Sequence, residues 1–410
     1  MYTDSLLHVD VTAIGRNAEA FVHLAGPASA CCGIVKADAY GLGARRVAPT
    51  LIEAGFSLLA VFRVEEALEL LSEPLAVPVL VLGPVRGLSQ VHPLAPDLLN
   101  GAAELVVHDQ RQLEEVAHLA RSGTRPIGIH IELDVGMRRG GTDVPTATGL
   151  VQSAIEMAGI QLCGVMSHFT AAGYDADTTE SEAMIMADFL RQVGPLPAGC
   201  RVHAAATAAA VRDDRLRYDL VRIGLGWSGT VPGEASLGAL AADTLTPAIR
   251  WRSRVSHVHR VSVGETVGYG GTWAATCNTI IGIVPLGYAD GIPVSAGADR
   301  RRTGASIAVM KPRSGETPVG YAPIVGAVSM DQCAIDLGGC GGSPESLIGR
   351  ELEVLSPVHD GPTSLQGFAG SCGMTPHQLL VGIGPRVRRV AVWRPDARVE
   401  QPGWAKAEAV

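Results

Sequence analysis

Short apolar runs rich in β-branched residues alternate with amphipathic stretches through the first 230 residues of the chain. The apolar runs are continuous, which is typical of parallel strands that are buried on both faces. The stretches between them, such as 64–71, 110–120 and 180–193, carry apolar residues at helical spacing. Strands separated by room for a helix predict an α/β fold, a (β/α)8 TIM-type barrel. The eight runs are 31–37, 57–62, 77–83, 103–108, 126–133, 162–168, 200–205 and 220–225.

An open, doubly wound parallel sheet is the rival to the barrel. That architecture usually binds a dinucleotide through a Gly-rich GxGxxG turn after its first strand. No such motif follows the first apolar run of this chain. The barrel is therefore the favoured prediction.

The hydrophobic pattern changes near residue 246. Polar and apolar residues alternate over 250–263, and short strand-like runs separated by Gly-rich turns follow, with one helix-like stretch at 375–382. This pattern predicts a mostly antiparallel β domain. We expect the barrel at 1–245, with its first residues able to pack on the second domain, the β domain at 246–399 and an exposed tail at 400–410. The later runs are 279–285, 306–310, 319–325, 332–337 and 351–355.

Composition narrows the functional classes. Hydrophobic residues make up 47% and charged residues 18% of the 410 positions, which predicts a large buried core. Acidic side chains outnumber basic ones by 41 to 33, which argues against a nucleic-acid partner. The N-terminal residues lack the pattern of a signal peptide, and no run reaches the ~18 apolar residues of a membrane helix, so we expect a cytoplasmic protein without a membrane partner. Eight scattered cysteines without a CxxC predict reduced thiols and no metal site.

Lys36 is the first candidate for chemistry. It ends the first apolar run, in IVKADAYGLG, and so lies at the C-terminal end of a predicted barrel strand, where this fold builds active sites. A lysine that is partly removed from water has a lowered pKa and can form a Schiff base with a carbonyl compound. Gly41 and Gly43 follow closely and allow the backbone to approach a ligand.

The segment IVKADAYGLG resembles the pyridoxal-phosphate lysine motif of the alanine racemase family, usually VKANAYGHG. Further segments resemble the family's motifs in the family's order, and together they span both predicted domains. The resemblance implies a (β/α)8 barrel followed by a β domain, which agrees with the division drawn from the hydrophobic pattern. The further segments are SHFTAAG (167–173), VRIG (221–224), GETVGYGGTW (264–273), PLGYADG (285–291), VGAVSMDQ (325–332) and GPRVRRV (384–390).

The resemblance implies two catalytic bases. Lys36 would hold the cofactor covalently and act as one base, and Tyr269, in GYGGTW, would act as the second base in the site of the other subunit of a homodimer. Racemisation needs one proton taken from one face of the substrate Cα and another delivered to the opposite face. Because the ordinary tyrosine pKa is ~10, this tyrosine would need a cationic neighbourhood.

The resemblance also implies a set of cofactor-binding residues. Arg222, in VRIG, would face the pyridine nitrogen of pyridoxal 5'-phosphate, and as a group that only donates hydrogen bonds it would keep that nitrogen unprotonated. His168, in SHF, would lie beside the cofactor ring. The expected phosphate-binding residues are Tyr40, Thr207, Gly224 and Leu225.

Substrate-binding residues follow from the same resemblance. Arg139, in GMRRGG, would touch both the cofactor phenol oxygen and the substrate carboxylate, for which a guanidinium fork is suited. Met330 and Asp331, in SMDQ, would meet that carboxylate from the partner subunit.

Several positions depart from the family's usual pattern. Glu132 stands where the family often carries a carbamylated lysine held against the arginine at position 139, and we expect Glu132 to supply the same negative charge to Arg139. Ala391 replaces a tyrosine on the phosphate, Ala206 replaces a common asparagine, and GLGWSG at 224–229 replaces the usual G-[IL]-x-L-Y-G. None of these departures touches the two expected bases.

The resemblance implies pyridoxal-phosphate-dependent racemisation of a small amino acid, most simply L-alanine to D-alanine for cell-wall peptidoglycan. A racemase of relaxed specificity, acting on serine or larger side chains, is one alternative, and a decarboxylase built on the same two domains is another. The alternative from another class is a non-catalytic cofactor carrier. A barrel-only carrier should lack the second domain with its Tyr269 and SMDQ segments.

Overall fold

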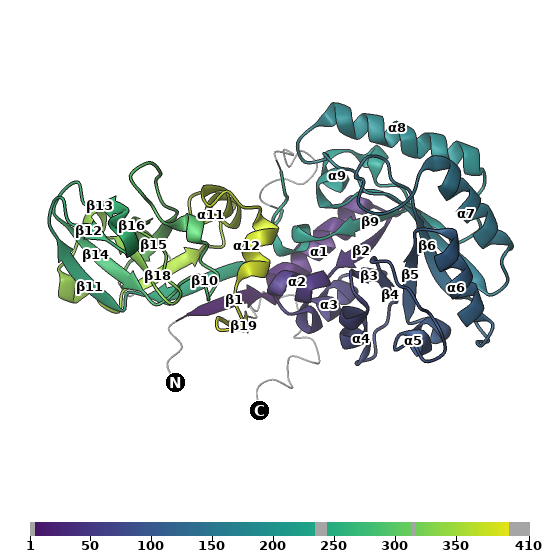
Figure 1. The fold of residues 1–410 in the computed structure, drawn as a ribbon, viewed down its shortest axis with the longest axis horizontal. Helices are drawn as coiled ribbons and strands as arrows, with labels where there is room; N and C mark the ends of the chain where they lie inside the picture. The colour runs from purple at the N-terminus through teal and green to yellow at the C-terminus, as the bar shows by residue number, and fades with distance from the viewer. Residues whose placement is uncertain (1–4, 234–243, 313–316, 393–410) are drawn as a thin grey trace. The chain divides into compact units, whose positions relative to one another are not determined.

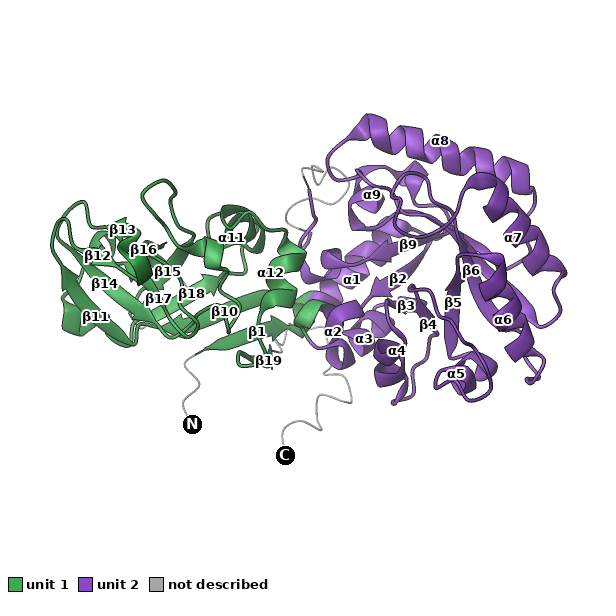
Figure 2. Ribbon diagram, in the orientation of Figure 1, with its two compact units in different colours: residues 1–13, 40–42, 246–410 green, residues 14–39, 43–245 purple. Residues whose placement is uncertain are grey.

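The computed structural model describes residues 5–233, 244–312 and 317–392 (Figure 1). The chain divides into two compact units (Figure 2). Unit 1 consists of residues 1–13, 40–42 and 246–410, and unit 2 consists of residues 14–39 and 43–245. The tail expected at 400–410 lies outside the described residues.

Unit 2 contains the parallel barrel that the apolar runs predict. Its eight strands follow the order β8-β7-β6-β5-β4-β3-β2-β9. An isolated parallel bridge between Ala206, just after β8, and Arg222 of β9 links the two ends of this order. Residues of these strands are buried almost throughout, which explains why the runs are continuous rather than alternating. The strands are β2 (Ala30–Ile34), β3 (Leu58–Val61), β4 (Val79–Val81), β5 (Ala103–Val107), β6 (Ile127–Glu132), β7 (Ile160–Met166), β8 (Arg201–His203) and β9 (Leu220–Ile223).

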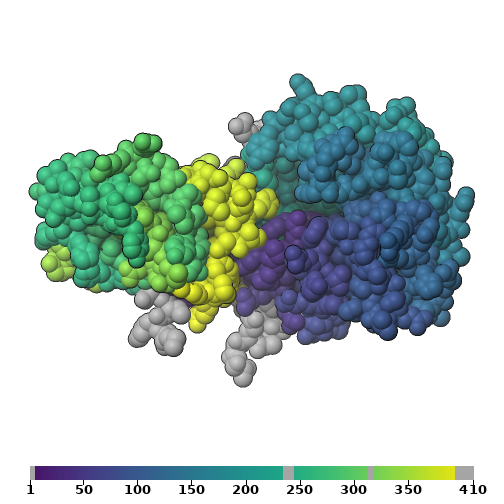
Figure 3. Space-filling view, viewed as in Figure 1, coloured from purple at the N-terminus to yellow at the C-terminus, as the bar shows by residue number. Residues whose placement is uncertain are grey.

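Helices follow the strands and cover the outside of the barrel. Asp109, Asp143 and Asp175 each accept a backbone N–H from the first turn of the helix that follows, so three of these helices begin at an aspartate N-cap. The space-filling view shows the blue-to-teal residues of the later helices forming the outer face of unit 2 (Figure 3). The helices are α1 (Val11–Ala25), α3 (Ala44–Glu53), α4 (Val64–Leu71), α5 (Ala95–Asn100), α6 (Gln110–Ala120), α7 (Val144–Glu156), α8 (Ala176–Val193) and α9 (Thr207–Arg212).

Unit 1 is built on a nine-stranded sheet with the order β11-β14-β17-β16-β15-β18-β10-β1-β19. All neighbouring pairs are antiparallel except β1 with β19. A separate hairpin pairs β12 (Thr266–Val267) with β13 (Trp273–Ala274). The strands of the large sheet are β1 (Leu6–Asp10), β10 (Ile249–Arg254), β11 (His257–Val261), β14 (Thr279–Val284), β15 (Ser306–Met310), β16 (Pro318–Val325), β17 (Cys333–Asp336), β18 (Glu351–Leu355) and β19 (Arg388–Val392).

Three features of unit 1 differ from the sequence pattern. The alternating run 250–263 is two strands, because the chain leaves β10 at Val255, whose N–H donates to Arg350, and enters β11 after Ser256, whose N–H donates to Ile283. β1 and β19 were not predicted as strands, and each depends on a partner distant in sequence. Helices α10 (Pro344–Leu347) and α11 (Leu365–Ser371) precede the expected helix, α12 (Pro376–Gly382).

No helix among the described residues is long and apolar enough to span a bilayer.

Candidate active site

Five of the expected site residues follow barrel strands at one end. Lys36 follows Val35 after the end of β2, Arg139 lies in the loop after β6, and His168 follows β7. Thr207 opens α9 after β8, and Arg222 lies within β9 near its end. Because the carboxyl ends of parallel barrel strands form one face, these side chains belong to the same mouth.

Burial and the neighbouring cations at this mouth lower the pKa of Lys36. Burial is the largest cause, the Arg139 and Arg222 guanidinium groups act in the same direction, and the Glu66 carboxylate opposes them. A lowered pKa increases the neutral fraction of the amine, which is the form that attacks a carbonyl carbon.

Lys36 begins an unusual left-handed turn, labelled α2 (Lys36–Gly41). The residues at 37–40 have φ between 52° and 58°, a region that costs non-glycine residues ~1–2 kcal/mol each. The Glu66 carboxylate holds the turn: Oε1 accepts the Ala37 N–H at 2.6 Å, and Oε2 accepts the N–H groups of Phe62 and Arg63 at 2.9 Å. Backbone strain that the surroundings maintain is typical of functional sites. Sequence reasoning missed Glu66 because only its position in the folded barrel connects it to Lys36.

Arg222 is buried and held by several acceptors. Its Nη2 donates to the carbonyls of Ser167 at 2.7 Å and Ala204 at 3.1 Å, and Nη1 donates to the carbonyl of His203 at 3.0 Å. Nη2 also lies 3.1 Å from Nδ1 of His168. Within the described residues no hydrogen bond uses its Nε–H, and no carboxylate lies within 4.0 Å of the guanidinium. Arg222 therefore keeps a donor for a ligand at the mouth.

His168 is neutral at physiological pH. Burial, followed by the charges of Arg222, Arg139 and Lys36, lowers the pKa of its imidazole to about 3. The neutral ring accepts a hydrogen bond at Nδ1 from Arg222, which places the remaining ring proton on Nε2.

The segment after β9 packs closely against α9. The Gly224 N–H donates to the Thr207 hydroxyl at 3.1 Å, and Leu225 opens a one-turn 3-10 helix. A Cβ on Gly226 would lie 2.6 Å from the Phe21 ring and 2.7 Å from the Thr207 methyl group. This position therefore requires glycine, and the turn keeps its backbone near the mouth of the barrel.

Glu132 does not pair with Arg139 as the sequence analysis expects. Its Oε2 lies 3.1 Å from Nδ1 of His108, and no hydrogen bond or ion pair joins Glu132 to Arg139 in the described part of the chain. The loop after Glu132 does turn back, but it brings glycines against the Glu132 carboxylate. A Cβ on Gly140 would lie 2.7 Å from Oε2 of Glu132. The Gly141 N–H donates to His108. Arg139 is left exposed.

The other expected residues belong to unit 1. Tyr269 lies in a one-turn 3-10 helix and is 76% exposed, and Met330 is 52% exposed. A Cβ on Gly268, next to Tyr269, would come within 3.0 Å of the Ala327 N–H nitrogen, so the GYGG turn packs on the segment that leads to Met330. Two large side chains on adjoining loops thus face outward.

Backbone and side-chain contacts hold the SMDQ loop. The N–H groups of Tyr288 and Ala289 donate to the carbonyls of Ser329 and Met330, each at 3.0 Å. A Cβ on Gly287 would lie 2.2 Å from the Met330 carbonyl, so only glycine fits there. The loop carrying the expected substrate contacts is therefore fixed by the GYADG segment.

Arg386 adds a charged link in the same region. Its Nε donates to Asp290 at 3.0 Å, and its Nη1 donates to Asp331 at 2.8 Å. Asp290 is buried and also accepts the Gly287 N–H at 2.9 Å. Sequence analysis placed Arg386 in a motif, GPRVRRV, without giving it a role.

Two further expected positions are found in unit 1. Tyr40 packs edge-on against His377, with ring centroids 5.2 Å apart. Ala391 lies in β19 opposite Val9 of β1.

Glu182 of α8 is a buried carboxylate that sequence analysis did not single out. Its oxygens accept the N–H and the hydroxyl of Thr170, at 2.8 and 2.5 Å. It therefore anchors the SHFTAAG loop that carries His168. An acidic residue within a predicted helix has no sequence pattern that indicates a role in anchoring a distant loop.

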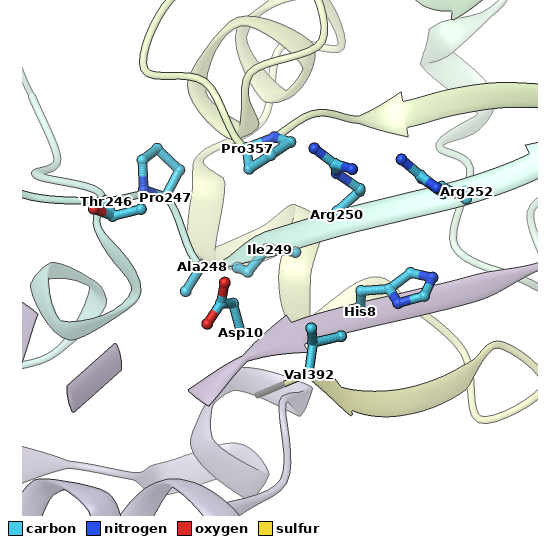
Figure 4. A pocket seen from close by; sticks show the side chains of 10 residues that line it. All are labelled: His8, Asp10, Thr246, Pro247, Ala248, Ile249, Arg250, Arg252, Pro357 and Val392. Atoms are coloured by element: carbon cyan, nitrogen blue, oxygen red, sulfur yellow. The ribbon is translucent and has the colours of Figure 1, made fainter. Parts of the chain in front are cut away.

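A pocket in unit 1 lies beside β1, β10 and β19 (Figure 4). Its cations are already paired, since Arg250 and Arg252 lie 3.3 and 3.0 Å from the Glu353 carboxylate. The lining residues include none of the expected site residues. They are His8, Asp10, Thr246, Pro247, Ala248, Ile249, Arg250, Arg252, Pro357 and Val392.

Comparison with known proteins covers both units. The family model for the alanine racemase N-terminal domain matches residues 9–232, and that for the alanine racemase C-terminal domain matches residues 248–391. Alanine racemase of Geobacillus kaustophilus is 32% identical over 396 residues, covering 95% of this chain and 94% of its own. That of Sorangium cellulosum is 32% identical over 371 residues, covering 87% and 90%.

Solved structures similar to this chain are also alanine racemases. Alanine racemase from Streptomyces coelicolor A3(2) superposes with a TM-score of 0.82 at 27% identity, covering 95% of this chain and 98% of its own. The alanine racemase from Bartonella henselae, solved with covalently bound pyridoxal phosphate, shares the fold with a TM-score of 0.80 at 23% identity, covering 95% and 99%. With a matching barrel, a matching β domain and these relatives over nearly its whole length, the chain belongs to the alanine racemase family.

Proposed function

We propose that this isomerase racemises alanine with pyridoxal 5'-phosphate, held covalently by Lys36, as a homodimer with shared active sites. The observation that carries the proposal is the barrel mouth itself, where a lysine of lowered pKa stands with Arg222 and a neutral His168. Supply of D-alanine for peptidoglycan, in the cytoplasm, is part of the same proposal.

The residues at the mouth fit pyridoxal phosphate. Arg222 has an Nε–H without a protein acceptor among the described residues, and it remains protonated because guanidinium groups do not lose their proton in proteins. Gly224, Leu225 and Thr207 would hold the phosphate, with Tyr40 as a further donor. Bound pyridoxal phosphate supplies an electron sink that makes the hydrogen on the substrate Cα acidic.

Two bases on opposite faces of the substrate would carry the proton transfers. The Lys36 amine, neutral in part because of its burial and its cationic neighbours, takes or returns the Cα proton on one face. We assign the opposite face to Tyr269 of the partner subunit. Its large exposed ring supports this assignment, since contiguous exposed apolar groups mark interaction surfaces.

The substrate carboxylate would be bound by Arg139, with Met330 and Asp331 of the partner subunit completing the site. The exposed Arg139 side chain has no protein acceptor among the described residues, so its fork is open to a carboxylate. A guanidinium binds the carboxylate, which all amino acids share, and does not contact the substrate's side chain. These contacts therefore suit alanine and also other small amino acids.

Trapping and racemisation together test the proposal. Borohydride reduction followed by peptide mapping should place a pyridoxyl group on Lys36, and circular dichroism should follow loss of optical activity from L-alanine in a panel of L-amino acids. Lys36→Ala should lose both the yellow colour and the activity. A label on another lysine would contradict the assignment of the cofactor, and labelled protein without racemisation would favour a carrier.

A further inference from the structure

A buried chain of hydrogen bonds crosses the barrel from Arg222 to Glu104. Arg222 Nη1 lies 3.1 Å from His203 Nδ1, His203 Nε2 lies 2.8 Å from His130 Nδ1, and His130 Nε2 lies 2.7 Å from Glu104 Oε2. The four residues come from β9, β8, β6 and β5, and each is at most 9% exposed. The comparison with the family motifs gives Glu104 no role.

The two ends of the chain determine the direction of every hydrogen bond in it. Arg222 can only donate, so His203 must accept at Nδ1 and carry its proton on Nε2. His203 then donates to His130 Nδ1, which leaves the His130 proton on Nε2 to be donated to Glu104. A second proton on either ring would place two N–H donors opposite each other, so this pattern of hydrogen bonds corresponds to one proton on each ring, at Nε2.

The charges agree with this direction. Burial lowers the pKa of His203 well below its usual value, and the charges of Arg222 and Arg201 act in the same direction. Burial alone would raise the pKa of the Glu104 carboxyl, but the His130 hydrogen bond, the charge of Arg201 and a contact from Cys163 lower it overall. Glu104 is therefore ionised at neutral pH, at the far end of a chain that begins at a buried cation.

The length of the chain has a physical consequence. A buried guanidinium without a counter-charge is costly, but a carboxylate bound directly to Arg222 would compete for its donors. The Glu132 carboxylate acts on the Arg222 charge through space. The chain connects a second carboxylate, that of Glu104, to Arg222 through three hydrogen bonds, and it leaves the Arg222 Nε–H without a protein acceptor among the described residues. Hydrogen bonds in such a chain polarise one another, so the charge of Glu104 affects the hydrogen bond that Arg222 makes at the other end.

We propose that Glu104 is a positioning residue of the active site, acting through His130 and His203 on Arg222. The inference rests on the proposed function, because Arg222 acts there on the cofactor ring. The Glu104 carboxylate holds the imidazoles of His130 and His203 in one tautomer. Arg222 is thereby presented as a donor with a remote counter-charge.

Nuclear magnetic resonance of 15N-histidine-labelled protein tests the chain directly, without and with added pyridoxal phosphate. In the wild-type protein at about pH 8, above the ordinary histidine pKa of ~6.5, both rings should be found in the Nε2–H tautomer. A doubly protonated ring, or a proton on Nδ1, would overturn the proposal. This measurement needs no variant, so it stands even if a variant fails to fold.

Glu104→Gln removes the charge and keeps the shape. We expect the ring 15N signals of both His130 and His203 to shift, and kcat for alanine to fall roughly tenfold at a nearly constant KM, the size often seen when a supporting hydrogen-bond partner is lost. A purely structural carboxylate would move the His130 signal alone and leave kcat per folded molecule unchanged, and either result would overturn the inference.

Cys163→Ala is the matched control, because Cys163 contacts the same carboxylate without belonging to the chain. It should leave the His203 signals and kcat unchanged. Wild-type protein that neither binds pyridoxal phosphate nor racemises alanine would contradict the proposed function, whereas the tautomers measured without cofactor report on the chain itself. The two failures are thus distinguishable.

Discussion

At the scale of single residues, burial decides which of the barrel's titratable groups carry charge. His168 shows the effect most clearly, since burial and the cations around it lower the pKa of its imidazole to about 3. His203 is shifted in the same direction. Both rings serve as neutral hydrogen-bond acceptors for Arg222, a role that protonation would abolish.

His168 makes folding stability depend on pH. Between the ordinary pKa of ~6.5 and the folded value of about 3, the unfolded chain binds a proton that the folded chain does not, so the unfolding free energy falls as the pH falls. In His168→Gln the slope between about pH 4 and 6 should be smaller by up to ~1.4 kcal/mol per pH unit. Urea unfolding at several pH values measures it, and equal slopes in both proteins would contradict a shifted His168.

Gly226 is a position where one methyl group should matter. Gly226→Ala places a Cβ 2.6–2.7 Å from the buried Phe21 ring and the Thr207 methyl, and overpacking of this kind costs ~1–3 kcal/mol. We expect a lower thermal midpoint and weaker binding of pyridoxal phosphate in an absorbance titration. Gly149→Ala, in α7 with nothing within 4 Å of the added Cβ, is the control and should be neutral or stabilising. Tight cofactor binding in Gly226→Ala would argue against a phosphate near this turn.

At the scale of elements, the loops at the strand ends are held by acidic side chains and by glycines. Glu66 maintains the left-handed turn after β2, and Glu182 of α8 anchors the loop after β7. In unit 1, Gly287 allows the GYADG segment to lie against the Met330 carbonyl. Each loop thus depends on a residue from another element, so its conformation is a property of the packed unit.

Arg386 offers a test at this scale. Arg386→Ala removes the link between Asp290 and Asp331 and frees the SMDQ loop. We expect KM for alanine to rise roughly fivefold, which corresponds to the ~1 kcal/mol of a charge-assisted hydrogen bond at a half-exposed site, with a smaller change in kcat. Steady-state kinetics measures it, with Arg350→Ala as the control, because Arg350 is a half-buried arginine of the same unit that donates to the Ser346 carbonyl. An unchanged KM would mean that the loop does not need this link.

At the scale of the whole molecule, the proposed shared site predicts complementation. Inactive Lys36→Ala and Tyr269→Phe chains, mixed and allowed to exchange subunits, should regain about a quarter of wild-type activity, because half of the dimers are mixed and each mixed dimer has one site with both native bases. Mass spectrometry of the mixed dimers provides the control for exchange. Continued inactivity after demonstrated exchange would show that each chain builds its own site.

Much of the fold was readable from the sequence. Each of the eight predicted apolar runs overlaps a barrel strand, and the change of pattern near residue 246 coincides with the start of the last segment of unit 1. The exceptions, β1 and β19, are held by each other and by distant partners. Local patterns report burial on both faces of a strand, but they do not report which strand will pair with another.

The sequence by itself determined the barrel, the β domain and the position of Lys36 at a strand end, because apolar runs and motifs are local properties of the chain. The tertiary structure decided the partners of the charged groups. Glu132 lies against His108 instead of Arg139. Glu104 is linked to Arg222 through His130, which is 26 positions from Glu104, and His203, which is 73 positions from His130. A charged side chain is stabilised by whichever opposite or hydrogen-bonding group the fold brings within a few ångströms, and only the packed structure specifies that group.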